Sequence, residues 1–143
     1  MPTVLESTRG RPRASARTTA ACRTGKLLTP ESAVDIQRAL GSDIMMVLDE
    51  CTPYPCSHAD AERSMELSMR WALRGRDRWH QVSDGSQALF GIVQGGIYPD
   101  LRRRSIDALL EMGFPGMAIG GLSVGEPKDL MVETVRETAP LLP

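Results

Sequence analysis

The chain has 143 residues, a formal net charge of −1, a hydrophobic share of 41% and an aromatic share of 4%. This length is typical of one domain, and the near-neutral charge excludes a chain that binds nucleic acid through overall positive charge. No apolar run is long enough to span a bilayer, so we expect no membrane partner. Three cysteines at irregular spacing are too few for a disulfide framework, which favours a reducing, cytoplasmic setting.

Residues 1–25 differ in composition from the rest of the chain. They contain a single acid, Glu6, and Thr, Ser and Ala fill most of the gaps between five arginines, which are Arg9, Arg11, Arg13, Arg17 and Arg23. No helical or strand period is present, so we expect a disordered basic segment. Three alternatives stay open: an organelle transit peptide, a basic arm that touches RNA phosphates, or a start region replaced by unrelated sequence.

A helix is predicted within Leu28–Asp43. Thr29 is a favourable N-cap and Pro30 suits the first helical position. Ser32 stands where a full capping box would have Glu or Gln, and Gly41 is the expected end. We expect the helix to have a partly apolar face formed by Val34, Ile36, Ala39 and Leu40.

Three short apolar runs have the length and composition of buried strands. They are Ile44–Leu48, Ala88–Val93 and Gly116–Ile119. Each run ends abruptly in a polar or glycine-rich group, which is Asp49 for the first, Gln94-Gly95-Gly96 for the second and Gly120-Gly121 for the third. Such endings are typical of functional groups at the C-terminal ends of parallel strands.

Amphipathic helices are predicted after each strand. The first should run from Ala59 to Arg76, with Gly75 starting its end and a polar connection over Asp77–Gln87. Its expected buried stripe consists of Ala61, Met65, Met69 and Ala72, widened by Leu67, Trp71 and Leu73.

The second of these helices should run from Pro99 to Met112 and end at Gly113. Its expected core residues are Leu101, Ile106, Leu109 and Leu110, whereas the run Arg102-Arg103-Arg104 is expected to face solvent. A last helix should begin at Pro127 and end at Pro140.

Consecutive β-loop-α units predict an α/β fold with a parallel sheet whose strand ends share one rim. A closed barrel of this type needs eight strands and about 250 residues. We therefore expect that other chains complete the sheet or that the chain is a piece of a larger protein.

The three strand ends offer a carboxylate, a primary amide and a backbone N–H, from Asp49, Gln94 and Gly121. The carboxylate accepts two neighbouring donors, and the amide both donates and accepts. The N1–H, exocyclic amine and O6 edge of guanine fits this set, whereas adenine would leave Asp49 unpaired. A phosphate-binding turn at Gly120-Gly121 is the alternative interpretation.

The motifs DECTPYP, FGIVQGG and GGLSVGEP, with LTPE upstream, resemble the bacterial tRNA-guanine transglycosylases of queuosine biosynthesis over Leu28–Pro143. This resemblance implies a (β/α)8 TIM barrel, of which residues 26–143 would form about three consecutive βα units plus a leading helix. The implied activity replaces guanine at the wobble position of the tRNA anticodon with a 7-deazaguanine (preQ1 or queuine). The family also carries a structural zinc and forms homo-oligomers.

The resemblance also implies roles for individual residues in binding the base. Asp49 would recognise the base beside Cys51, Gln94 would lie on its O6 side, and the Gly121 N–H would donate there. Leu122 would lie next to Gly121. Glu126 would support the peptide of that loop.

The family's general base lies in an Asp-Ser-Gly-Gly-Phe-Gln motif that is not present upstream of the LTPE motif. Its nucleophilic aspartate, its zinc ligands and its basic tRNA surface are expected beyond Pro143. Within this chain we therefore expect no catalytic residue, no metal and no activity in isolation. The spacing of Cys51, Cys56 and His58 matches no common zinc site. The alternatives are a non-catalytic partner subunit or binding module, and an unrelated phosphate-binding barrel enzyme.

Overall fold

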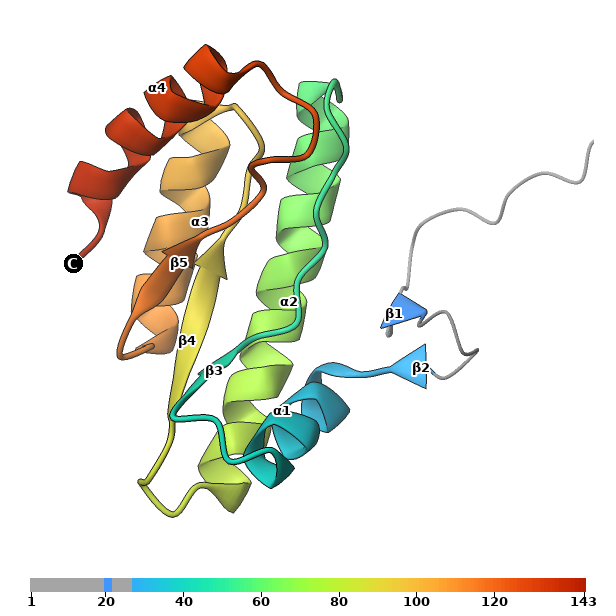
Figure 1. The fold of residues 1–143 in the computed structure, drawn as a ribbon, viewed down its shortest axis with the longest axis vertical. Coiled ribbons are helices and arrows are strands. Elements are labelled where there is room, and N and C mark those ends of the chain that lie inside the picture. The colour runs from blue at the N-terminus through green and yellow to red at the C-terminus, as the bar shows by residue number, and fades with distance from the viewer. Residues whose placement is uncertain (1–19, 22–26) are drawn as a thin grey trace, which may run out of the picture.

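A computed structural model describes residues 20–21 and 27–143 (Figure 1). Except for residues 20 and 21, the basic segment 1–25 lies outside the described residues, and with it the expectation of disorder. The elements, in chain order, are β1 Ala20–Ala21, β2 Leu27–Leu28, α1 Pro30–Ala39, β3 Ile44–Met46, α2 His58–Val82, β4 Ala88–Val93, α3 Pro99–Met112, β5 Met117–Ile119, α4 Lys128–Thr138 and the 3-10 helix η1 Ala139–Leu141.

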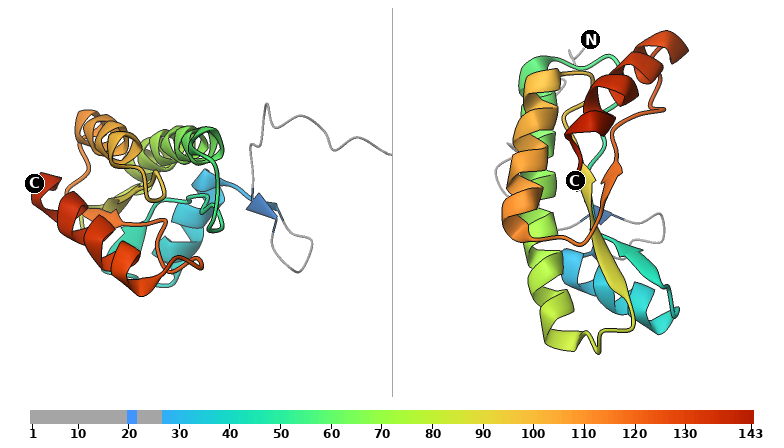
Figure 2. Two further views of the ribbon diagram at one scale, coloured as in Figure 1. Left: turned by 90° about the horizontal axis from the view of Figure 1, so that it is seen from above. Right: turned by 90° about the vertical axis from the view of Figure 1, so that its left-hand side faces the viewer.

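The main sheet is parallel, with the strand order β3-β4-β5, while β1 and β2 form a separate antiparallel pair. Helix α2 connects β3 to β4, and α3 connects β4 to β5. The predicted α/β fold of alternating strands and helices is therefore confirmed. Figure 2 shows α2 and α3 side by side on one face of the sheet. The main core is formed by Val34, Met45, Val47, Ala72, Leu89, Val93, Ile106, Leu109 and Phe114.

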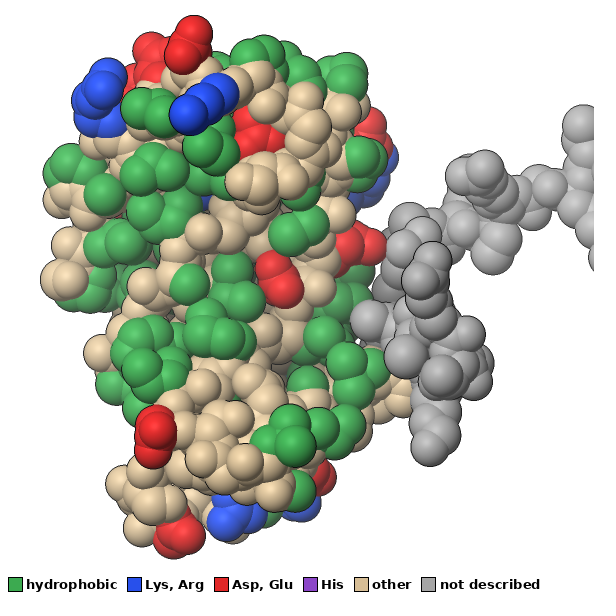
Figure 3. All heavy atoms as spheres, in the orientation of Figure 1, with side chains coloured by type: hydrophobic (Ala, Val, Ile, Leu, Met, Phe, Trp, Pro, Cys, Tyr) green, Lys and Arg blue, Asp and Glu red, His purple; other side chains and the backbone are tan. Residues whose placement is uncertain are grey.

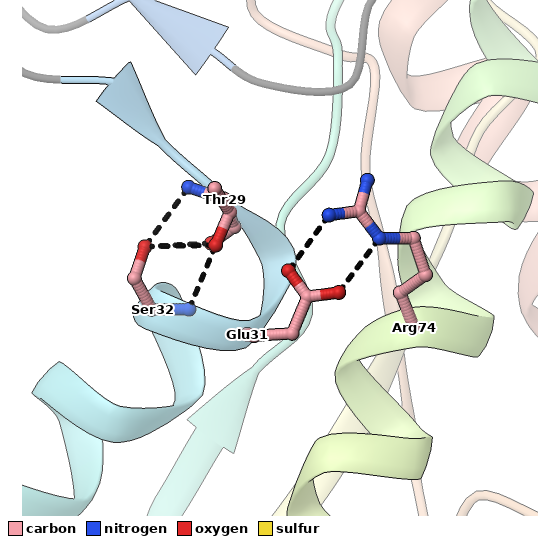
Figure 4. Close-up of polar contacts among 4 residues, drawn as sticks. All are labelled: Thr29, Glu31, Ser32 and Arg74. Atoms are coloured by element: carbon pink, nitrogen blue, oxygen red, sulfur yellow. Dashed lines mark hydrogen bonds and ion pairs between the residues drawn. The ribbon is translucent and has the colours of Figure 1, made fainter.

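Helix α1 begins with a complete capping box, which the sequence did not predict. The Thr29 hydroxyl accepts from the Ser32 N–H at 3.1 Å, and the Ser32 hydroxyl accepts from the Thr29 N–H at 2.9 Å (Figure 4). Serine thus fills the place of the usual Glu or Gln. Of the four residues of the predicted apolar face, Val34 is buried, whereas Ile36, Ala39 and Leu40 are exposed. Helix α1 instead packs through Pro30, Ala33 and Val34.

Helix α2 continues to Val82, so the predicted end near Gly75 is wrong. Gly75 is buried, and a Cβ there would lie 3.8 Å from Val34 Cγ2 and 3.9 Å from the Pro30 oxygen. Gly75 thus lies where α2 packs against α1, and this packing outweighs the low helix propensity of glycine. Further along the helix, Arg78 forms a two-point ion pair with Asp35 of α1.

Arg74 binds both oxygens of Glu31 at 2.7 Å, which holds the pKa of Glu31 below its ordinary value of 4.5 (Figure 4). This contribution to stability is fully present above that value and is lost as the pH falls through the lowered pKa. Glu31→Gln should therefore lower the free energy of unfolding at pH 7, by less at about pH 3. Urea unfolding at both pH values measures this, with the exposed Glu133→Gln as control. An equal effect of Glu31→Gln at the two pH values would contradict the prediction.

Helix α3 has the predicted bounds and ends at Gly113, which adopts a left-handed conformation with φ 75°. Two expectations about its faces are wrong. Leu110 is 47% exposed instead of buried, and Arg102 is buried instead of facing solvent. In α2, Leu73 is also exposed rather than part of the core stripe.

The outer edge of β3 is partly occupied by a side chain from α1. The Gln37 amide donates to the Met46 oxygen and accepts from the Met46 N–H, both at 2.8 Å.

In the orientation of Figure 1 the sheet lies in front of α2 and α3, and apolar side chains are spread over the visible face (Figure 3). Among the described residues, no helix has the length and apolar character needed to cross a membrane.

Candidate functional site

The ends of the three parallel strands bring the predicted groups together around the side chain of Gln94. Its Nε2 donates to Asp49 Oδ2 at 2.5 Å. On the other side, a Cβ built on Gly121 would lie 2.6 Å from Gln94 Oε1. Gln94 therefore binds the carboxylate of Asp49 and lies beside the backbone of Gly121, and the three residues come from separate β-loop-α units.

Gln94 is only 3% exposed and is fixed at its backbone as well as its side chain. Its N–H donates to the hydroxyl of Ser105 on α3 at 3.0 Å. Its Nε2 also lies 3.5 Å from Cys51 Sγ, and this exposed thiol lies 3.7 Å from Asp49 Oδ2. Cys51 thus borders the pair formed by Asp49 and Gln94.

The glycine pair at the end of β5 is required by close packing. A Cβ on Gly120 would lie 2.4 Å from Ile92 Cγ2 and 2.8 Å from Gln94 Nε2. Gly121 has φ +67°, a conformation that strongly favours glycine. The Gly120 N–H donates to the Val93 oxygen at 2.9 Å, whereas the buried Gly121 N–H has no hydrogen-bond partner among the described residues. Gly121 therefore presents a free donor beside Gln94.

The loop after the glycine pair is held by Glu126. Its carboxylate accepts from the N–H groups of Ser123 and Val124, the latter at 2.9 Å. Desolvation opposes ionisation, but these backbone hydrogen bonds prevail and lower the pKa of Glu126. Leu122, the other predicted residue of this loop, is half-buried.

A small pocket opens beside this loop. Its lining includes two of the predicted residues, Gly121 and Glu126, but not Asp49, Gln94 or Leu122. The contact between Gln94 and Asp49 closes the space between their side chains. The complete lining is Thr52, Pro53, Tyr54, Cys56, Gly96, Ile97, Gly121, Val124 and Glu126.

Arg102 was missed by the sequence prediction. It is 1% exposed, and its guanidinium donates to the Gly96 oxygen at 2.7 Å and to the Gly120 oxygen at 3.1 Å. Burial lowers the pKa of Arg102 to about 10, partly offset by the negative charge of Glu126. The helical period could have found it, because Arg102 precedes the buried Ser105 by three positions.

The cysteines and histidine near the start of α2 make other contacts. Cys56 Sγ donates to the Thr52 hydroxyl at 3.5 Å, and His58 Nε2 lies 2.8 Å from Asp100 Oδ2. Within residues 20–21 and 27–143 there is no group of three or more His, Cys, Asp or Glu side chains that could hold a metal ion. These residues therefore do not fit a zinc site.

The chain is similar to proteins of one known family. A family model described as queuine tRNA-ribosyltransferase matches residues 13–143. Queuine tRNA-ribosyltransferase from Dechloromonas aromatica is 58% identical over 116 residues, which are 81% of this chain and 31% of the relative. The proteins of that name from Desulforudis audaxviator and Acinetobacter baylyi are 58% and 54% identical, over 80% and 76% of this chain and 30% and 28% of their own lengths.

The chain thus spans about a third of the length of the curated relatives that it matches, at 31% of the first. The family model covers nearly the whole chain, including all three strand ends. The resemblance seen in the sequence motifs is therefore confirmed, and the chain belongs to the queuine tRNA-ribosyltransferase family.

Proposed function

We propose that this chain provides the base-recognition part of a transferase that replaces guanine at the wobble position of a tRNA anticodon with a 7-deazaguanine. The observation that carries this proposal is the direct contact of Gln94 with Asp49 and its closeness to Gly121. The names of the relatives support the substrate class, since each is a queuine tRNA-ribosyltransferase.

Guanine fits the donors and acceptors of this site. Its N1–H and exocyclic amine would donate to the carboxylate of Asp49, and its O6 would accept from Gln94 and from the Gly121 N–H. In the structure Gln94 donates to Asp49, so the donors of the base would replace Gln94 as the hydrogen-bond partner of this carboxylate. Adenine has no pair of donors on that edge and would leave the carboxylate without partners.

The parallel sheet would be part of a (β/α)8 barrel in the whole protein. Its tRNA surface, structural zinc, nucleophilic aspartate and general base would be supplied by residues outside these 143. We place the whole protein in the cytoplasm and expect it to form homo-oligomers, as its family implies. Within the chain, Cys51, Leu122 and Glu126 would complete the surroundings of the base.

Ligand binding tests the proposed pocket. Guanine and 7-deazaguanine should raise the melting temperature of the chain and release or absorb heat in calorimetric titrations, whereas adenine should do neither. Stabilisation by inorganic phosphate but not by guanine would contradict the proposal and favour a phosphate-binding barrel enzyme.

The isolated 143-residue chain should not exchange the base. Covalent catalysis requires a nucleophile to attack the ribose C1′, and we assign that nucleophile to another part of the whole protein. Incorporation of labelled guanine into tRNA measures the exchange, with the Dechloromonas aromatica relative as the positive control. Turnover by the isolated chain would overturn this assignment.

A further inference from the structure

Arg102, the buried arginine of α3, binds two of the loops that form the site. Its Nε and Nη2 donate to the oxygens of Gly96 and Gly120, which follow the ends of β4 and β5. A single guanidinium therefore ties together two of the three loops of the site. Its Nη1 is also buried and has no hydrogen-bond partner among the described residues.

The bond to Gly120 has a geometric consequence for Gly121. The oxygen of Gly120 and the N–H of Gly121 belong to the same peptide unit, and in a trans peptide they point in opposite directions. When Arg102 holds this oxygen on the side of α3, the N–H of Gly121 points away from α3. That N–H has no hydrogen-bond partner among the described residues, and it lies beside Gln94.

The peptide unit between Gly120 and Gly121 is the part of this loop whose orientation depends most on a contact from another element. Glycine on both sides gives it the widest choice of backbone conformations, and no Cβ opposes its rotation. The segment is anchored before this unit by the bond from the Gly120 N–H to Val93, and after it by Glu126. Between these anchors, Arg102 is the described side chain that binds the unit itself.

We propose that Arg102 is a positioning residue that aims the Gly121 N–H at O6 of the bound base. This inference rests on the proposed base pocket. Arg102 does not touch the base, but acts through the orientation of one peptide unit. The second hydrogen bond of its guanidinium, to the Gly96 oxygen, holds the loop after Gln94 next to the glycine pair.

The test compares Arg102→Lys with Arg103→Lys in the full chain. Arg103 is the next residue, is exposed, and undergoes the same chemical change. A lysine has one small donor group and cannot reproduce the planar fork that holds two carbonyls. Calorimetry gives the affinity for guanine, and ¹⁵N–¹H spectra show whether the Gly121 amide proton shifts downfield when guanine is added.

Arg102→Lys should weaken guanine binding about tenfold, the size expected for one lost hydrogen bond, and should abolish the shift of the Gly121 amide. Arg103→Lys should behave as the unchanged chain. Unchanged affinity in Arg102→Lys, or weaker binding with the Gly121 shift intact, would overturn the role of Arg102 while leaving the pocket in place. Absence of guanine binding by the unchanged chain would instead overturn the pocket itself.

If Arg102→Lys does not fold, a crystal structure of the unchanged chain with guanine tests the inference instead. A crystal structure of the chain with guanine should show the Gly121 nitrogen within hydrogen-bond distance of O6, with Arg102 still on the Gly120 oxygen. A complex in which that oxygen has left Arg102 would overturn the inference.

Discussion

Replacing Asp49 by asparagine should reduce guanine affinity by about a hundredfold or more. A hydrogen bond to a charged group contributes about 1.5–3 kcal/mol, and asparagine removes the charge while turning an N–H group toward the donors of the base. Both effects act at the side chain that already binds Gln94. Isothermal titration with guanine measures the loss.

The matched control is Asp43→Asn, which removes an exposed carboxylate at the opposite end of the same strand region. It should leave guanine binding unchanged, and both variants should give the same far-ultraviolet circular dichroism as the parent chain. Equal guanine affinity in Asp49→Asn and the parent chain would show that Asp49 does not bind the base.

The largest effect on stability is expected at Leu109. Its side chain is completely buried in the main core, so Leu109→Ala should lower the free energy of unfolding by about 3 kcal/mol. The neighbouring Leu110 is 47% exposed, and Leu110→Ala should cost less than about 1 kcal/mol. Urea unfolding of the two variants measures the difference. Similar losses for both would show that α3 is rotated relative to the described packing.

This pair also illustrates the limit of helix prediction from sequence. Apolar content and the flanking Pro99 and Gly113 predicted the correct bounds of α3. The pattern could not decide which of two adjacent leucines faces the sheet, because both extend the same apolar run. In the structure, Leu109 shares the buried face of the helix with Leu101 and Ile106.

The strand ends were more predictable than the helix faces. In a parallel sheet the polar group that ends each buried run lies on a common rim, so sequence order alone places Asp49, Gln94 and Gly121 near one another. Only the structure shows that Gln94 binds Asp49 and lies beside Gly121, and the roles of the three residues in binding a base remain predictions. The lengths of the outer strands were less predictable, since β3 ends at Met46 rather than Leu48.

Two features, the helical conformation of Gly75 and the burial of Arg102, were not predicted because tertiary contacts reverse the usual preference of each residue. Glycine normally weakens a helix, but Gly75 is buried where α2 packs against α1. Arginine is normally exposed, but Arg102 finds two backbone oxygens in the interior. Neither contact lies within the helix that contains the residue, so a local pattern could not predict the partners, although the helical period places Arg102 on the buried face of α3.

The amide of Gln37 has a consequence for the behaviour of the chain in concentrated solution. An outer strand with free backbone groups is a template on which other chains can add strands and aggregate. Gln37 occupies both backbone groups of Met46, at the C-terminal end of β3. A strand that adds to this edge next to Met46 must first displace this amide, so a single side chain opposes intermolecular β-pairing at that position.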